Sequence, residues 1–292
     1  MPTRRLRSLA LAAGFAVLAA APTQAACPDA AAVAAFVADW TAKKPVDPPF
    51  GAGLSAADAV CAQNAVVAAL APSLGPTVGY KAALTNPAMQ EKLKATGPVL
   101  GVLLEGMLLD DGAEITAKYG AVPVYEADMV LVVADEAIND AGTPEEALAH
   151  VRAMRPFIEL ADFVAADTAK LDMSAITAAD AGARLGVLGE ETPLDTSPAG
   201  VAALAGMTVV MTDGDGKVLS QAPGSALMGN PLNALLWVIE DVQSRGGRLK
   251  AGDLVSVGAF SPLTPPAPGL VVNVAYQGLQ GSPSVSVEFN DE

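Results

Sequence analysis

The spacing of hydrophobic and polar residues divides the chain into a mainly helical first part and a second part of short apolar runs. Apolar residues at helical spacing predict an amphipathic helix over residues 29–44, which includes Val33, Phe36 and Trp40. Ser55, with Asp58 three residues later, occupies a capping-box position and begins a second helix. The helices predicted before residue 97 are 29–44, 55–70 (ending before Pro72) and 86–94, with one short strand over 77–84.

After residue 97 the pattern favours strands, because short apolar runs are interrupted by Gly and Asp. Two helices are expected there, over 144–154 and 231–244, and 164–183 is expected to be a mobile loop or irregular helix. Asp213-Gly214-Asp215-Gly216 lies between two apolar runs and predicts a hairpin turn rather than a calcium loop. The predicted strands are 99–104, 107–109, 122–134, 155–163, 207–212, 217–220, 254–257, 270–276 and 284–289. Helices first and strands later indicate the α+β class.

Three acids stand out within this pattern. Glu126 and Asp128 are two residues apart at the head of an apolar run, so they project from one face of the expected strand. Glu159 lies in a second apolar segment, RPFIELADF. Buried carboxylates repel one another unless a cation or a shared proton compensates. Three oxygen ligands suit Mg²⁺, Mn²⁺ or Ca²⁺, and the alternative is that these acids are solvated at strand ends.

Composition restricts the partners of the protein. The chain has 292 residues, 52% of them hydrophobic and 4% aromatic, which is typical of a globular protein. Its formal net charge of −15 argues against binding to nucleic acid or to an anionic membrane. The charge says nothing more about function.

The first 26 residues have the pattern of a signal peptide. Arg4, Arg5 and Arg7 precede a short apolar stretch over 8–21, and Thr23-Gln24-Ala25 offers a cleavage site. The alternative is an uncleaved anchor. No later stretch is expected to span a membrane, so the mature protein is predicted to be exported, to the periplasm.

The two cysteines fit an exported protein, because an oxidising compartment permits disulfides. Cys27 and Cys61 are both expected in N-terminal helices that could pack antiparallel. A Cys27–Cys61 disulfide is predicted, and two unpaired thiols are the alternative.

Five segments in order resemble the 2-keto-4-pentenoate hydratases of the fumarylacetoacetate hydrolase superfamily, alongside the related 4-oxalocrotonate decarboxylases. The resemblance runs from about residue 56 to residue 289. Its segments are GYKAALTNPAMQ (79–90), GVLLEGMLL (101–109), PVYEADMVLVV (123–133), FIELADF (157–163) and GNPLNALLWVIEDVQSRGGRLKAGDLVSVG (229–258).

The resemblance implies a mixed β-roll with N-terminal helices and one divalent cation, Mg²⁺ or Mn²⁺. The family's E-x-E…E ligands correspond to Glu126, Asp128 and Glu159, and its active-site lysine in G-x-K-x-x-L-T corresponds to Lys81. A nearby cation and burial are both expected to lower the pKa of that lysine. The implied organisation is a signal peptide (1–26), an N-terminal helical region (27–96) and a catalytic β-roll (97–292).

The implied activity is that of a hydratase, a lyase acting on a small 2-oxo acid or its dienol from aromatic-ring breakdown, and the protein is expected to be a homo-oligomer. The alternatives are a decarboxylase of the same family and a non-catalytic periplasmic binding protein, which export would favour. Three departures from the family pattern bear on this choice: Asp128 replaces a glutamate, Val99-Leu100 replaces an Asp-Phe pair, and 179–183 lacks an asparagine. The single histidine, His150, has no apparent catalytic partner and is expected to be structural.

Overall fold

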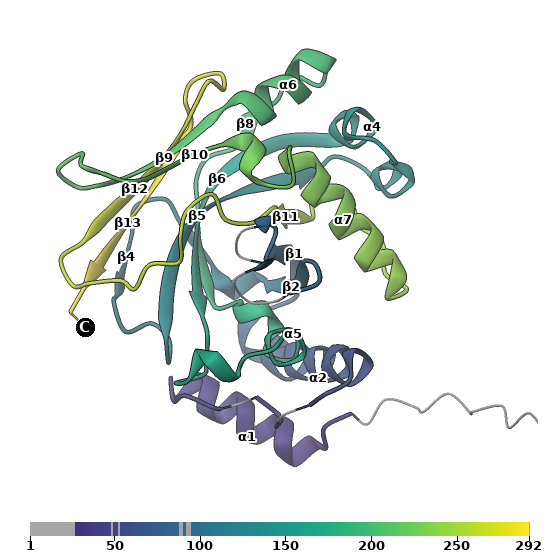
Figure 1. Ribbon diagram of the computed structural model, residues 1–292, viewed down its shortest axis with the longest axis vertical. Coiled ribbons are helices and arrows are strands. Elements are labelled where there is room, and N and C mark those ends of the chain that lie inside the picture. Colours follow the sequence, from purple (N-terminus) through teal and green to yellow (C-terminus); the bar gives the residue numbers. More distant parts are fainter. Residues whose placement is uncertain (1–26, 48, 52, 88–89, 92–94, 292) are drawn as a thin grey trace, which may run out of the picture.

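The computed structural model describes residues 27–291 except 48, 52, 88–89 and 92–94. The predicted signal peptide and much of the predicted helix over 86–94 therefore lie outside the described residues. The described chain folds into two β-sheets with helices at both ends (Figure 1). The predicted α+β class and mixed β-roll are confirmed.

The larger sheet has eight strands of mixed direction. β1 runs parallel to β11 and β3 parallel to β7, whereas the other pairs are antiparallel. The predicted boundary between residues 96 and 97 falls between β1 and β2, which are neighbours in this sheet. The strand order is β2 (Val99–Leu104), β1 (Thr77–Ala83), β11 (Leu254–Ser256), β5 (Pro123–Val133), β6 (Val151–Asp162), β7 (Leu185–Leu188) and β3 (Leu108–Asp110), with β8 (Thr192–Pro193) paired to β6.

The smaller sheet has five strands and packs against the larger one. Ala127, Met129 and Leu131 alternate with the acids along β5 and join the core formed with this second sheet. That alternation leaves Glu126 and Asp128 on the opposite face of β5, away from the main core. The strand order is β10 (Val218–Pro223), β9 (Thr208–Asp213), β12 (Val271–Gln277), β13 (Ser284–Asn290) and β4 (Ala113–Thr116).

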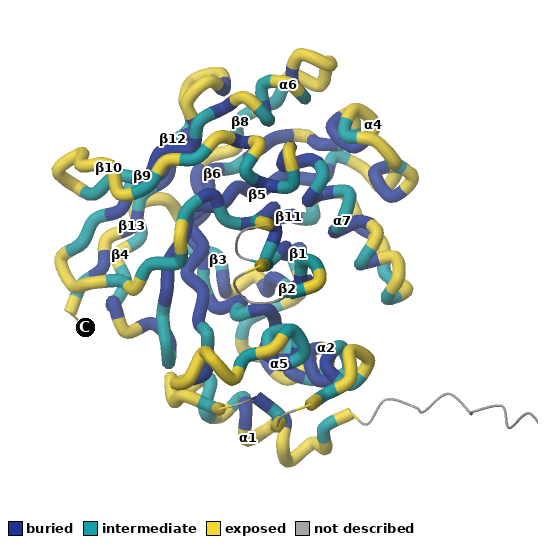
Figure 2. Tube along the Cα trace, in the orientation of Figure 1, coloured by how far each residue is buried: buried dark blue, intermediate teal, exposed yellow. Residues whose placement is uncertain are grey.

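Helices cover the two ends of the large sheet, and the most buried segments are the strands between them (Figures 1 and 2). At one end lie α1 (Ala30–Thr41), α2 (Ala56–Leu74) and α5 (Met173–Ala178); at the other lie α4 (Pro144–Ala149), α6 (Pro198–Gly206) and α7 (Pro231–Ser244). The 3₁₀ turns are η1 (Glu105–Met107), η2 (Glu136–Asp140), η3 (Thr168–Lys170), η4 (Asp180–Gly182) and η5 (Gly224–Ala226).

The N-terminal helices are tied to the rest of the chain by covalent and polar contacts. Cys27 and Cys61 form the predicted disulfide, with their Cα atoms 5.3 Å apart. Cys27 lies just before α1, however, and not within a helix. Arg184 stacks over the ring of Trp40 at 3.8 Å and donates a hydrogen bond to the Trp40 carbonyl oxygen at 2.7 Å. These contacts fix α1 and α2 against the β-roll.

Helix α2 departs from the sequence prediction in two ways. It continues through Pro72 to Leu74, because a proline in the last turn removes only one hydrogen bond near the helix end. It also has 19 residues with a mean hydropathy of 1.2, so by length and composition it could cross a membrane, contrary to expectation. Its buried face, which includes Gln63, Val66 and Leu70, packs against the folded domain.

One further prediction needed correction. The helix expected over 144–154 ends at Ala149, and Val151–Asp162 form strand β6 instead, because these residues pair with β5 on one side and with β7 and β8 on the other. For the segment over 164–183, the structure agrees with the irregular helix and not with the mobile loop, since α5 and the 3₁₀ turns η3 and η4 lie within it. The predicted turn at Asp213–Gly216 is confirmed between β9 and β10.

Candidate active site

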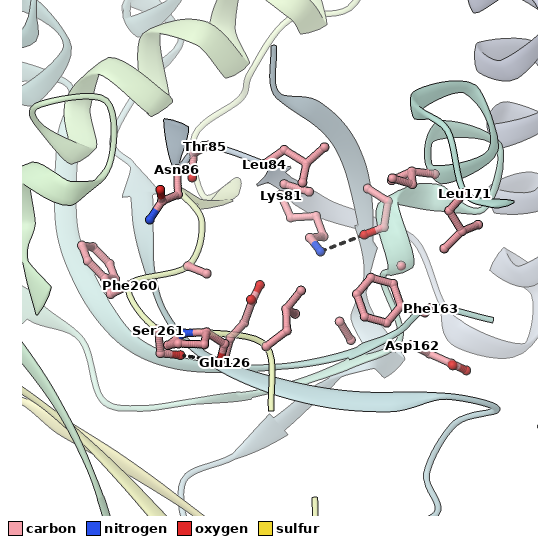
Figure 3. Close-up of a pocket in the computed structure, with 18 of the residues that line it drawn as sticks. Lys81, Leu84, Thr85, Asn86, Glu126, Asp162, Phe163, Leu171, Phe260 and Ser261 are labelled. Atoms are coloured by element: carbon pink, nitrogen blue, oxygen red, sulfur yellow. Dashed lines mark hydrogen bonds between the residues drawn. The ribbon is translucent and has the colours of Figure 1, made fainter. Parts of the chain in front are cut away.

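A cavity of about 490 Å³ opens beside the end of β1 that carries Lys81. Figure 3 shows the Glu126 carboxylate and the Lys81 ammonium pointing into the same space. Phe163 and Leu171 lie on one side of this space, and Phe260 lies on the other. The wall is mainly apolar, and its described residues are Lys81, Ala83, Leu84, Thr85, Asn86, Glu126, Ala161, Asp162, Phe163, Leu171, Ile176, Ala179, Ala181, Gly182, Ser220, Gln221, Ala259, Phe260, Ser261, Pro262 and Leu263.

Strand register brings the three predicted acids together, and of the three Glu126 alone lines this cavity. Glu126 on β5 pairs directly with Glu159 on β6, and Asp128 lies two residues further along the same face of β5. All three side chains are buried, and the exposed fraction of Asp128 is zero. We call Glu126, Asp128 and Glu159 the acid cluster.

Burial and mutual repulsion raise the pKa values of two of these acids. The pKa of Glu126 is well above its ordinary value because the carboxyl is buried and lies close to Glu159, although Lys81 lowers it in part. The pKa of Asp128 rises to about 7 for the same first two reasons. Hydrogen bonds from Ser256 and the Met129 amide oppose that rise. The cluster therefore holds more negative charge than its surroundings compensate.

Lys81 contributes the positive charge beside the acid cluster. Its Nζ forms an ion pair with Glu159 and donates a hydrogen bond to the Ala181 carbonyl oxygen at 3.0 Å. In a flat sheet, β1 and β6 would lie roughly 14 Å apart, so this contact reflects the curl of the roll and the length of both side chains. Gly101 gives the lysine room, because a Cβ there would lie 2.6 Å from the Lys81 Cγ.

The lowering of the Lys81 pKa was expected beside a bound cation, and without a cation the pKa is raised instead. Burial alone would lower this pKa, but attraction from Glu159 and Glu126 outweighs burial and raises it. Lys81 is therefore an ammonium group in this arrangement. It can donate a hydrogen bond or a proton, and it can hold an anion.

Asp128 is held by hydrogen bonds from three elements. The Ser256 hydroxyl donates to Oδ2, and the Gly258 amide donates to Oδ1 at 3.0 Å. The Tyr276 hydroxyl donates to the main-chain oxygen of Asp128. Gly258 has a φ of +106°, and a Cβ there would collide with Thr85, so glycine is required at that position. These contacts fix the direction of the Asp128 carboxylate.

The donor set fits a divalent cation in chemistry and charge. Its ligands would be carboxylate oxygens, which Mg²⁺ and Mn²⁺ prefer, and ionisation of all three acids beside one ammonium, against the raised pKa values of Glu126 and Asp128, would leave two negative charges for a cation to offset. The described side chains do not converge on one point, since no three Asp, Glu, His or Cys groups among them are placed to hold an ion. Glu159 turns instead toward Lys81 and Asp128 toward Ser256.

A second buried polar group lies behind Lys81, and we call Gln63, Asp180 and Arg245 the support network. Gln63 Nε2 donates to Asp180 Oδ1 at 2.8 Å and to the Leu100 carbonyl oxygen at 2.7 Å. Arg245 Nη1 donates to Gln63 Oε1 at 2.7 Å, and the Val102 amide donates to Asp180 Oδ1 at 2.9 Å. Burial raises the pKa of Asp180 to about 7. The network joins α2, β2, η4 and the end of α7.

The support network fixes the backbone that contacts Lys81. Asp180 and Ala181 have φ values of +56° and +52°, and Gly182 follows at +71°. Left-handed backbone is costly for the two non-glycine residues, so the surrounding contacts must hold it in place. It directs the Ala181 carbonyl oxygen at Lys81 Nζ. The sequence prediction noted the missing asparagine in this segment but did not assign a role to Asp180.

The remaining sequence candidates lie apart from the cavity. His150 has an acid partner that the sequence did not reveal, since its Nδ1 lies 2.9 Å from Asp135 Oδ1. This pair is partly exposed and neither residue lines the cavity. Val99 and Leu100, which replace a polar-aromatic pair of the family, are buried in β2 and do not line it either.

Comparison with known proteins places these features in a family. The model for "Fumarylacetoacetate (FAA) hydrolase C-terminal" matches residues 76–282. The chain is 32% identical over 186 residues to the 2-keto-4-pentenoate hydratase of Burkholderia vietnamiensis (strain G4 / LMG 22486), covering 64% of this chain and 69% of the relative. It is 30% identical over 213 residues to the 2-keto-4-pentenoate hydratase of Paraburkholderia xenovorans (strain LB400), covering 73% and 76%.

A solved structure agrees with the fold. The 4-oxalocrotonate decarboxylase from Pseudomonas putida G7, complexed with magnesium and adipate, superposes with a TM-score of 0.76 at 23% identity. The match covers 89% of this chain and 96% of that one. At this identity the likeness concerns the fold alone.

Proposed function

The chain belongs to the fumarylacetoacetate hydrolase family, and from that membership we propose that it is a hydratase acting on a small 2-oxo acid or its dienol. The resemblance drawn from five sequence segments is thereby confirmed. Two relatives at 30–32% identity are 2-keto-4-pentenoate hydratases, which supports a lyase of that type. Glu126, Asp128, Glu159 and Lys81 are the residues to which we assign the chemistry.

One observation carries the proposal: three buried carboxylates and one ammonium lie together at an apolar cavity. Burying this much like charge is costly unless a cation or protons offset it. We propose that Mg²⁺ or Mn²⁺ binds there through Glu126, Asp128 and Glu159. The magnesium in the decarboxylase structure supports this choice of ion.

The reaction adds water across a carbon–carbon double bond. The dienol first gives up its 2-hydroxyl proton and gains a proton at the far end of the diene, which yields a 2-oxo-3-enoate. Water oxygen then bonds to C4 and a water proton ends at C3, giving a 4-hydroxy-2-oxo acid. When bound, the divalent cation would supply Lewis-acid stabilisation for the 2-oxo oxygen and the carboxylate of the substrate.

The residues of the chain position the substrate and move its protons. Lys81 Nζ, held by Glu159 and the Ala181 carbonyl oxygen, points into the cavity, where it can pair with the substrate carboxylate or deliver a proton. Ser256 and the Gly258 amide keep Asp128 in one orientation. The apolar wall excludes water other than the reacting molecule, which strengthens these electrostatic contacts.

The test of this function is metal-dependent thermal stability, alone and with pyruvate as a 2-oxo acid. Mg²⁺ or Mn²⁺ is expected to raise the Tm, and pyruvate to raise it further, because both bind the folded state. Glu126→Ala is expected to abolish both shifts and to reduce hydration of 2-hydroxypenta-2,4-dienoate roughly a thousandfold. Glu114→Ala, which removes an exposed acid on β4, is the matched control and should behave as wild type.

Other outcomes separate the alternatives. Release of CO₂ from 4-oxalocrotonate without hydration would identify a decarboxylase. Metal-dependent binding of 2-oxo acids without turnover would identify a binding protein. No Tm shift with either ion would contradict the metal site.

We also propose that the mature protein is exported to the periplasm. The N-terminal sequence pattern and the Cys27–Cys61 disulfide support this location, because disulfides persist in oxidising compartments. Cell fractionation and sequencing of the mature N-terminus test it, and cytoplasmic protein that retains residue 1 would contradict it. The expected homo-oligomer stays a prediction, which light scattering checks.

A further inference from the structure

The wall of the active-site cavity carries information on the substrate beyond its 2-oxo acid group. Resting on the proposed function, we infer that the substrate has a bulky apolar tail and no second carboxylate. The inference depends on the size of the cavity, the side chains that line it, and the charges that a distal group would meet.

The cavity is larger than a short 2-oxo acid needs. Its volume of about 490 Å³ lies within the range of pockets that enclose drug-sized ligands, roughly 300–1,000 Å³. A pentenoate-sized acid held at Lys81 and Glu126 fills only the part of this space next to the acid cluster. The remainder accommodates a tail the size of an aromatic ring.

The part of the cavity around this space is apolar. Phe163, which follows β6, and Leu171, which follows η3, lie together on one side of Lys81 (Figure 3). Ile176 on α5 adds a third apolar side chain to the wall, and Phe260 lies on the opposite side. Three of these side chains lie within residues 163–176 and the fourth is Phe260, and together they provide the apolar contacts that favour burial of a hydrocarbon tail.

The charges of the wall disfavour a dicarboxylate. Among the described lining residues, Lys81 is the single cationic side chain, and it is already paired with Glu159. The other charged lining residues are Glu126 and Asp162. Amides of Ala121 and Val122 donate to the Asp162 carboxylate at 2.8 and 2.7 Å. A divalent cation would compensate the first carboxylate of a substrate, but the described wall offers no further cationic side chain for a second, only neutral polar groups such as Asn86 and Ser261.

The test compares three unreactive 2-oxo acids by calorimetric titration of the full-length mature protein in the presence of Mg²⁺. They are 2-oxopentanoate, 4-phenyl-2-oxobutanoate and 2-oxohexanedioate, which differ in the group at the far end. The phenyl compound is expected to bind roughly tenfold tighter than 2-oxopentanoate, because it buries an aromatic ring. The dicarboxylate is expected to bind most weakly.

Two matched variants each introduce a positive charge, one inside the cavity and one outside it. Leu171→Arg places a cation in the cavity, and it is expected to improve binding of 2-oxohexanedioate at least roughly tenfold relative to the phenyl compound. Leu219→Arg introduces the same change on β10 at a side chain 38% exposed to solvent, which does not line the cavity, and should leave the order of affinities unchanged. Phe163→Ala is expected to remove most of the preference for the phenyl compound.

The outcomes distinguish this inference from the function on which it rests. Binding of the dicarboxylate by the wild-type protein as tightly as, or more tightly than, the phenyl compound would overturn the inference and leave the hydratase proposal intact. Absence of binding by all three acids with Mg²⁺ would overturn the proposed function as well. If Leu171→Arg does not fold, the order of affinities of the three acids for the wild-type protein tests the inference by itself.

Discussion

Lys81 lies between two buried polar groups that differ in how well their charges are compensated. In the acid cluster, three carboxylates face one ammonium, and the pKa values of Glu126 and Asp128 are raised. In the support network, one carboxylate is accompanied by an amide and a guanidinium that hydrogen-bond in series. When ionised, the acid cluster has three carboxylates for one ammonium, whereas the support network and the Asp241 carboxylate that pairs with Arg245 provide two carboxylates for one guanidinium.

This difference distinguishes the residues assigned to the reaction from those that hold the surrounding backbone in place. A buried excess of charge is costly, so it persists where a ligand, a metal ion or a reaction uses it. A compensated network instead stabilises one backbone conformation, here the left-handed segment that presents the Ala181 carbonyl oxygen to Lys81. We therefore expect substitutions in the acid cluster to change turnover more than stability, and substitutions in the support network to change stability more than turnover.

The largest effect is expected from Lys81→Met. Loss of the ammonium leaves Glu159 buried without its ion-pair partner, which should cost about 3–5 kcal/mol of unfolding free energy. Turnover should fall about 10²–10⁴-fold, because a proton-transfer group is lost. Urea unfolding and kcat measure these effects. Lys118→Met, at an exposed position, is the control.

A double variant sharpens this prediction. Lys81→Met with Glu159→Gln should regain much of the stability but not the activity, since the buried charge is removed along with its partner. Recovery of kcat in the double variant would contradict the role assigned to Lys81.

A smaller effect, visible as pH dependence, is expected from Asp180→Asn. The pKa of Asp180 is about 7 in the folded protein, whereas its ordinary value is 3.8. The folded state therefore holds the proton of the Asp180 carboxyl more tightly than the unfolded chain does. Its contribution to stability is thus present at about pH 4 and is lost as the pH rises through about 7, by up to about 4 kcal/mol. Asp180→Asn cannot ionise, so its stability relative to wild type should improve over that window.

Urea unfolding at several pH values measures this difference, with the exposed Asp215→Asn as control. Unfolding free energies of wild type and Asp180→Asn that run parallel from acid to neutral pH would show that Asp180 has an ordinary pKa.

The smallest effect is expected from Gln63→Leu. The change leaves the buried Asp180 without one of its donors and removes the Gln63 acceptor of Arg245, which keeps its ion pair with Asp241, at a cost of about 1–3 kcal/mol. Turnover should fall by less than roughly tenfold, because Gln63 acts on Lys81 only through the backbone of residues 180–182. Denaturant unfolding and kcat are the readouts, and exposed Gln277→Leu is the control. A loss of kcat as large as that of Lys81→Met would place Gln63 in the chemistry itself.

Much of the candidate site follows from local sequence rules. The alternation of a strand places Glu126 and Asp128 on one face, and apolar neighbours on either side indicated that both would be buried. The apolar segment around Glu159 suggested a third acid for the site, and the family resemblance added Lys81. The Lys81–Glu159 contact and the Glu126–Glu159 pairing agree with that assignment, while the binding of a metal ion stays a prediction.

Local sequence rules did not predict other features of the structure. Residues 151–154 were assigned to a helix, but partners on both sides draw them into β6, and strand pairing between distant segments outweighs local propensity. Without a cation the Lys81 pKa is raised and not lowered, because the sequence does not state how many carboxylates surround one ammonium. Asp180 drew no attention because its partners lie on α2, β2 and the end of α7.

The sequence by itself determined the family, the α+β class, the acids on one strand face and the lysine within its motif, because these depend on residue identity and short-range periodicity. Only the tertiary structure decided which acids face each other, which carbonyl oxygen holds the lysine, and which apolar side chains enclose the cavity. Those contacts join residues up to about a hundred positions apart. The curl of the large sheet and the docking of α2 and α5 set them, and neither is encoded in any single segment.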